Sequence, residues 1–236
     1  MDIGSPRRES GFTLIELAIA IVIVGLLLAG LLGPLSARVE QQERAKTQAL
    51  LEEIKEALLG YAAINGVLPC PTIQDDPANA GYGVAAPPPC PVGGPVGVPD
   101  GILPWKTLGV SPTDAWGRPR TAPGDPWRGY WRYRVDRNFT LPTTPITLTT
   151  QFNTTDALEV EDAANNKLTT TERPIAIVFS AGGQDRDDDG NDTDGDNTTY
   201  DSIYEAGLYS PTFDDMTIWL SRPLLFNRLI MAGKLP

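Results

Sequence analysis

The chain has 236 residues, a formal net charge of −11, an isoelectric point of about 4.5, two cysteines and no histidine. The lack of histidine excludes Ser-His-Asp and Cys-His catalysis, HExxH zinc sites and histidine-ligated haem, and two cysteines cannot form a four-thiolate metal site. The acidic balance disfavours binding to nucleic acid or anionic lipid by bulk electrostatics.

The N-terminal region consists of a basic pair, Arg7 and Arg8, followed by an apolar run over residues 12–35. Glu16 is the only ionisable side chain in that run. About 24 residues of helix reach roughly 36 Å, which is enough to cross the hydrocarbon core of a bilayer. Basic residues before the run and an acidic region after it predict a single span with the N-terminus in the cytoplasm. A plain anchor is the alternative, although a carboxylate within a membrane span is costly and usually functional.

The sequence GFTLIEL, from Gly11 to Leu17, resembles the processing motif of type IV prepilins and type II secretion pseudopilins. The resemblance implies that a prepilin peptidase cuts after Gly11 and methylates the new amino group of Phe12, so that residues 1–11 are a discarded leader. It also implies that Glu16 neutralises the amino terminus of a neighbouring subunit during filament assembly. Such a pairing is physically reasonable, because two charges that are each costly in hydrocarbon become tolerable together.

The resemblance divides the chain into four parts. They are a cleaved leader (1–11), a transmembrane and filament-core half of a helix (12–35), a periplasmic half of the same helix (36–66) and a globular head (67–236). The expected fold class is α+β and pilin-like. In this fold, a long N-terminal helical spine packs on a small antiparallel β-sheet with extended loops.

The periplasmic half of the helix is predicted to dock on the head through one apolar face. Apolar side chains recur there at three- and four-residue spacing, at Leu50, Ile54, Ala57, Leu58 and Tyr61. Asn65-Gly66 followed by Pro69 predicts the end of the helix.

Both cysteines lie in proline-rich sequence that is predicted to form an irregular loop. Export of the head to an oxidising compartment favours a disulfide between Cys70 and Cys90, and closing that loop would contribute roughly 3 kcal/mol. The alternative is a pair of free thiols.

The rest of the head is predicted to be mostly strands. The expected strands are residues 129–135, 143–152, 174–180 and 216–220, and residues 223–236 are expected to form a short amphipathic helix capped by Gly233. Residues 114–117 resemble the Asp-Pro-Trp-Gly turn of the major pseudopilin, with Ala115 in place of the proline. Four tryptophans are interpreted as core side chains, with an aromatic groove for sugar or peptide as the alternative: Trp105, Trp116, Trp127 and Trp131.

The strongest metal-site candidate is an acidic segment, residues 185–196, which follows the third of these strands. Oxygen-bearing side chains at its first, third and fifth positions, then Gly190, match the opening of a calcium loop, and Asp196 occupies the twelfth position. Residues 179–185 also resemble the segment before the calcium loop of the major pseudopilin, a family that often carries further acidic residues at the position of Asp214 and Asp215. The candidate ligands are Asp185, Asp187, Asp189, Asn191, Asp196, Asp214 and Asp215. A solvated acidic loop or a low-affinity cation surface is the alternative.

Together these features predict a non-enzymatic structural subunit, a pilin or pseudopilin with a calcium-stabilised head. The resemblance implies a bacterial inner-membrane location with a periplasmic head. Its partners would be other subunits, the prepilin peptidase and the inner-membrane assembly platform. These features fit a subunit of a type IV pilus or of a type II secretion filament. They also fit a major or a minor subunit. Two hypotheses from other classes are a membrane-anchored, calcium-dependent binding or adhesion protein that does not polymerise and an enzyme that uses the aspartate cluster.

Overall fold

Helix α1 extends from Leu14 to Asn65 in the computed structural model of the chain. The structure describes residues 13–74, 76–90, 101–117, 130–162, 164–170, 172–183, 202–210 and 213–235, and for residues 28–35 it describes the backbone alone. The chain divides into two compact units, Met1–Gln42 and Glu43–Pro236, and α1 contributes residues to each.

In the first unit, α1 carries a run of exposed apolar side chains. These include Leu14, Ile15, Leu17, Ile19, Ile21, Val22, Ile23, Val24, Leu26 and Leu27. Leu14 is 89% exposed and Leu26 is 70% exposed. Contiguous apolar surface of this kind marks a part of a protein that contacts lipid or other proteins.

In the second unit, the main sheet is four-stranded and antiparallel, with the order β1-β2-β4-β6. Its strands are β1 (Gly101–Ile102), β2 (Arg132–Val135), β4 (Pro174–Ser180) and β6 (Met216–Ser221). Strands β3 (Glu159–Glu161) and β5 (Ile203–Glu205) form a separate two-stranded parallel sheet. The short helices are α2 (Trp105–Leu108), the 3-10 helix η2 (Arg137–Phe139) and α3 (Arg222–Met231).

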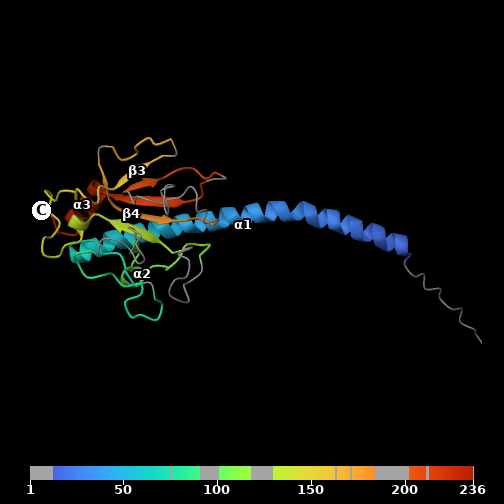
Figure 1. The fold of residues 1–236 in the computed structure, drawn as a ribbon, viewed down its shortest axis with the longest axis horizontal. Coiled ribbons are helices and arrows are strands. Elements are labelled where there is room, and N and C mark those ends of the chain that lie inside the picture. The colour runs from blue at the N-terminus through green and yellow to red at the C-terminus, as the bar shows by residue number, and fades with distance from the viewer. Residues whose placement is uncertain are drawn as a thin grey trace, which may run out of the picture. The chain divides into compact units, whose positions relative to one another are not determined.

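The C-terminal part of α1 packs on one face of the main sheet, alongside β4 (Figure 1). Its buried side chains in that core are Leu51, Ile54, Leu58, Leu59 and Ala62. They share the core with Ala176 and Val178 of β4, while Ile177 and Phe179 of the same strand join Tyr204 of β5 in a second cluster. Every residue of β4 is therefore buried, which explains its nearly continuous apolar sequence.

The predicted helix and three of the predicted strands are confirmed, although the strand expected over residues 129–135 is the shorter β2 (Arg132–Val135). Helix α1 ends at Asn65, and Gly66 follows with a φ of +76°, the left-handed conformation that glycine adopts without strain. Strands β4 and β6 match the expected residues 174–180 and 216–220 closely. The expected α+β arrangement, a long N-terminal helix packed on a small antiparallel sheet, is likewise confirmed.

The C-terminal segment also matches its prediction. Helix α3 ends at Met231, and Gly233 has a φ of +67°. Leu225 and Leu229 of α3 are buried in the same core as α1, so the helix packs back on the head. Arg228 of α3 forms an ion pair with Glu56 of α1 at 2.5 Å.

The prediction of a strand over residues 143–152 is wrong, because this segment forms turns. The Thr147 N–H donates to Thr150 Oγ1 at 2.8 Å, and the Thr147 hydroxyl lies 3.1 Å from that of Thr149. Threonine hydroxyls here satisfy local groups that a strand would pair with a neighbour. Pro142 and Pro145 each lack the N–H that a ladder needs.

Two tryptophans are confirmed as core side chains, whereas Trp116 is only half-buried and Trp127 lies outside the described residues. Trp131 is fully buried and its Nε1 donates to the Ser111 carbonyl at 3.0 Å. Trp105 is buried against Tyr82, with ring centroids 4.8 Å apart in an edge-to-face contact. Neither buried ring leaves a face open for a sugar or peptide.

Candidate functional site

The first turn of α1 places Glu16 in a capping box with Thr13. Glu16 Oε2 accepts the Thr13 backbone N–H at 2.9 Å and the Thr13 hydroxyl at 2.8 Å. In return the Glu16 N–H donates to Thr13 Oγ1 at 3.3 Å. This reciprocal arrangement satisfies backbone donors that the first turn of a helix otherwise leaves without partners. Gly11 and Phe12, the predicted processing residues, lie outside the described part of the chain.

No helix in the described part of the chain has both the length and the apolar character that a membrane crossing needs.

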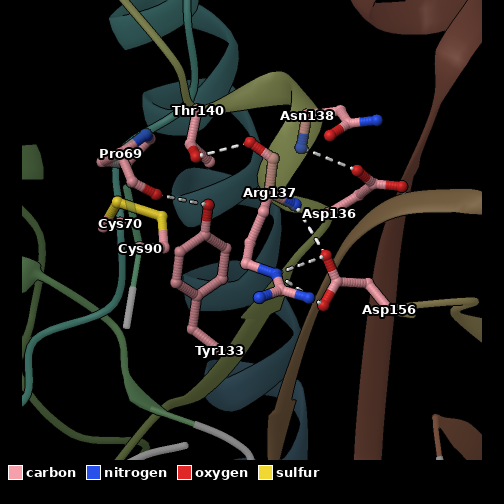
Figure 2. Close-up of a disulfide and its surroundings, with 9 residues drawn as sticks. All are labelled: Pro69, Cys70, Cys90, Tyr133, Asp136, Arg137, Asn138, Thr140 and Asp156. Atoms are coloured by element: carbon pink, nitrogen blue, oxygen red, sulfur yellow. Dashed lines mark hydrogen bonds and ion pairs between the residues drawn. A yellow bond between two sulfur atoms is a disulfide. The ribbon is translucent and has the colours of Figure 1, made fainter. Parts of the chain in front are cut away.

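The predicted disulfide is confirmed, and it lies within the main core (Figure 2). Cys70 and Cys90 are bonded, with their Cα atoms 5.2 Å apart. Beside them, the Tyr133 hydroxyl donates to the Pro69 carbonyl at 3.0 Å. Burial raises the pKa of Tyr133 well above its ordinary value, so the hydroxyl stays a donor. The Tyr133 hydrogen bond therefore joins the segment after α1 to strand β2, and the disulfide joins the same segment to Cys90.

A pair of buried carboxylates lies near the disulfide, where β2 leads into η2 (Figure 2). Asp136 accepts the backbone N–H groups of Asn138 at 2.9 Å and Asn153 at 2.8 Å. Asp156 accepts the Arg137 N–H at 2.9 Å, and the Arg137 Nε lies 3.1 and 3.0 Å from its two oxygens. Burial raises the pKa of Asp136 to about 6, against the opposing effect of the two N–H donors, and the charge on Asp156 adds to the rise.

The candidate metal ligands divide into those that the structure describes and those that it does not. Asp214 and Asp215 are described, and both are buried. The remaining candidates lie outside the described residues: Asp185, Asp187, Asp189, Asn191 and Asp196. Among the residues described, no group of three or more carboxylate, thiol or imidazole side chains could hold a metal ion. Asp214 and Asp215 could therefore hold calcium only together with other ligands.

The backbone at the end of β4 leaves room for the Asp214 carboxylate. Gly182 has a φ of +70°, and a Cβ placed on it would lie 2.5 Å from both Cγ and Oδ2 of Asp214. Any other residue would displace that carboxylate. The next glycine, Gly183, lies against the Trp116 ring, where a Cβ would be 2.8 Å from Nε1. Asp214 thus lies against Gly182, which is three positions before Asp185, the first of the candidate ligands in the sequence.

A further buried carboxylate, Asp114, contacts the end of β4. Its Oδ1 accepts the backbone N–H groups of Trp116 at 2.9 Å and Gly117 at 2.6 Å. Its Oδ2 accepts the hydroxyl of Ser180, the last residue of β4. Burial raises the pKa of Asp114, the three hydrogen bonds oppose that rise, and the negative charge of Glu43 adds to it.

The sequence predicts a turn at residues 114–117, but it does not predict the contact between Asp114 and Ser180. The order Asp-x-Trp-Gly does indicate a local role for the aspartate. An aspartate side chain commonly accepts the backbone N–H groups two and three residues after it and so caps its own turn. The contact with Ser180 joins residues that are 66 positions apart in the sequence. No local pattern predicts such a contact.

One family model matches the chain. The prokaryotic N-terminal methylation motif aligns with residues 6–32, which contain Gly11, Phe12 and Glu16. No curated protein and no solved structure matches the sequence. The chain therefore carries the N-terminal methylation motif that is the signature of type IV pilins and pseudopilins.

Proposed function

We propose that this protein is a structural subunit, a pilin or pseudopilin, of a type IV pilus or a type II secretion filament. The methylation motif over residues 6–32 is the observation that carries the proposal. The long helix packed on a small antiparallel sheet and the exposed apolar side chains near the start of α1 support it. A structural role also agrees with a chain that lacks histidine.

The precursor is proposed to be inserted in the bacterial inner membrane before it is processed. Residues 12–35 form the single span, the N-terminus faces the cytoplasm and the head is periplasmic. A prepilin peptidase removes residues 1–11 and methylates Phe12. The mature subunit then joins other subunits on an inner-membrane assembly platform, and Glu16 pairs with the amino terminus of a neighbour.

Calcium is proposed to stabilise the head at the acidic segment. The support comes from the buried Asp214 and Asp215 and from the close approach of Gly182 to the Asp214 carboxylate. Aspartate at the twelfth loop position, Asp196, has a shorter arm than the usual glutamate, so we expect weak binding suited to extracytoplasmic calcium concentrations. The ion would supply positive charge that relieves repulsion among the crowded carboxylates.

The first test is the intact mass of the protein extracted from membranes of cells with and without a functional prepilin peptidase. We expect loss of residues 1–11 and gain of one methyl group only when the peptidase is present. An uncut precursor in both strains would contradict the proposal and leave an anchored, acidic binding protein.

A second test separates a polymerising subunit from an anchored binder. Glu16→Gln removes the charge but keeps an oxygen that can accept the Thr13 hydrogen bonds, whereas Thr13→Ala removes the capping hydroxyl but keeps the charge. If assembly needs the charge pair, Glu16→Gln abolishes filaments, scored by electron microscopy and crosslinking, and Thr13→Ala retains them. Filament formation by both variants would refute the charge-pair role of Glu16.

A further inference from the structure

Helix α1 ends at Asn65, which is the only asparagine that a glycine follows in the sequence. Because glycine has no side chain, its backbone nitrogen can approach the side-chain carbonyl carbon of a preceding asparagine closely. Attack at that carbon forms a carbon–nitrogen bond, expels the side-chain nitrogen as ammonia and closes a succinimide ring, which water then opens to aspartate or isoaspartate. Asn65 is exposed and Gly66 is half-buried, so water reaches both residues.

In the folded head, both reacting groups are engaged in hydrogen bonds to the last turn of the helix. The Gly66 N–H donates to the Ala62 carbonyl at 2.7 Å, and Asn65 Nδ2 donates to the Tyr61 carbonyl at 2.9 Å. The glycine nitrogen has to lose its proton before it attacks, and the asparagine side chain has to turn toward it. Each hydrogen bond therefore opposes the reaction, which requires the last turn to open.

The last turn is held to the head on one side only. Ala62 is buried in the main core, whereas the side chain of Ile64 is 74% exposed and Asn65 is exposed as well. Segments with few buried apolar contacts open locally at a free energy well below that of global unfolding. Opening of the final residues of α1 would thus free the Gly66 nitrogen while the head stays folded.

We propose that Asn65–Gly66 is a deamidation site that the last turn of α1 keeps closed and that reacts when this turn opens. Deamidation replaces the side-chain amide with a carboxylate, so the donor to the Tyr61 carbonyl is lost. A negative charge is also unfavourable at the C-terminal end of a helix. The last turn of α1 contains no basic residue that could offset the charge.

The isoaspartate product would have a larger effect, because its main chain passes through the former side chain and is longer by one methylene. The segment just after the site is tied to the head: Leu68 is buried, and its N–H donates to the Phe139 carbonyl at 2.8 Å. A longer connection between Asn65 and Leu68 would disturb this attachment. Deamidation would therefore loosen the helical spine at the point where it joins the head.

The test follows the full chain in detergent and mildly alkaline buffer, with and without guanidinium chloride. Peptide mass spectrometry separates asparagine, aspartate and isoaspartate at position 65. In denaturant, Asn65 should react faster than Asn79, which precedes Ala80. Without denaturant, Asn65 should react at least about tenfold more slowly than in it, as expected from two intact hydrogen bonds. Equal rates at Asn65 in the two conditions would overturn the closed state, and a rate in denaturant no higher than that of Asn79 would overturn the site.

A matched pair of variants at Ile64 tests whether opening of the last turn controls the reaction. The exposed side chain of Ile64 contributes little packing, so Ile64→Gly and Ile64→Ala should both fold. Glycine weakens a helix relative to alanine, so Ile64→Gly should deamidate about fivefold faster than Ile64→Ala in buffer. In denaturant, where no helix remains, the two variants should react at similar rates. Equal rates in buffer, or the same difference in denaturant, would overturn control by the last turn.

Discussion

Asp136 illustrates how a single buried carboxyl can make the stability of the head depend on pH. Its side chain is 1% exposed and accepts hydrogen bonds from two backbone N–H groups. Those donors favour the charged form, but burial outweighs them and raises the pKa from 3.8 to about 6. The folded state therefore binds the Asp136 proton more tightly than the unfolded state does.

The resulting contribution to stability is fully present below about pH 4 and is lost as the pH rises through about 6. A shift of this size corresponds to about 3 kcal/mol of unfolding free energy. Asp136→Asn cannot titrate, so its unfolding free energy should fall less than that of the wild type between pH 4 and pH 7. Urea unfolding across this range measures the difference.

Asp162→Asn is the control for this experiment, with the opposite sign. Asp162 is half-buried, and hydrogen bonds from the Asn166 side chain and backbone lower its pKa. Its contribution is present above its ordinary pKa and is lost as the pH falls through the lowered value. Parallel pH curves for wild type and Asp136→Asn would contradict the assignment to Asp136.

At the scale of elements, the long and strongly apolar segments could be predicted from the sequence. The C-terminal part of α1 can be predicted because Ile54 and Leu58 recur at helical spacing, and both are buried in the core. Strand β4 is recognisable because a sheet strand covered on both faces needs apolar side chains at successive positions. In both elements, the spacing of apolar residues along the sequence is the spacing that packing in the core requires.

Short elements formed by distant partners could not be predicted. Strand β3 has the sequence Glu-Val-Glu and is only three residues long. It pairs in parallel with β5, although β4 lies between the two strands in the sequence. Asp114 accepts a hydrogen bond from Ser180, which is 66 positions away, and the neighbouring Ala115 N–H donates to Thr47 of α1, which is 68 positions away. These contacts arise from the tertiary fold, so sequence spacing carries no signal for them.

At the scale of the whole molecule, the disulfide closes a loop between residues separated by 20 positions in the chain. Cross-linking such a loop restricts the unfolded chain and contributes about 3 kcal/mol in the chain-entropy description. The double variant Cys70→Ala, Cys90→Ala should lower the unfolding free energy by about that amount, measured by urea denaturation. A reductant should lower the midpoint of the wild type and leave the double variant unchanged. Equal midpoints for the two proteins without reductant would contradict this estimate.

The capping box at the start of α1 has a consequence for maturation. Thr13 and Glu16 both lie after the Gly11–Phe12 bond, and the hydrogen bonds between them need no residue before Thr13. A cut at that bond would therefore leave the helix with its own N-terminal stop intact, only one residue from the new chain end. In the proposed maturation, the first turn of the helix would stay folded after the cut, so the leader could be removed without fraying the helix that is proposed to mediate filament assembly.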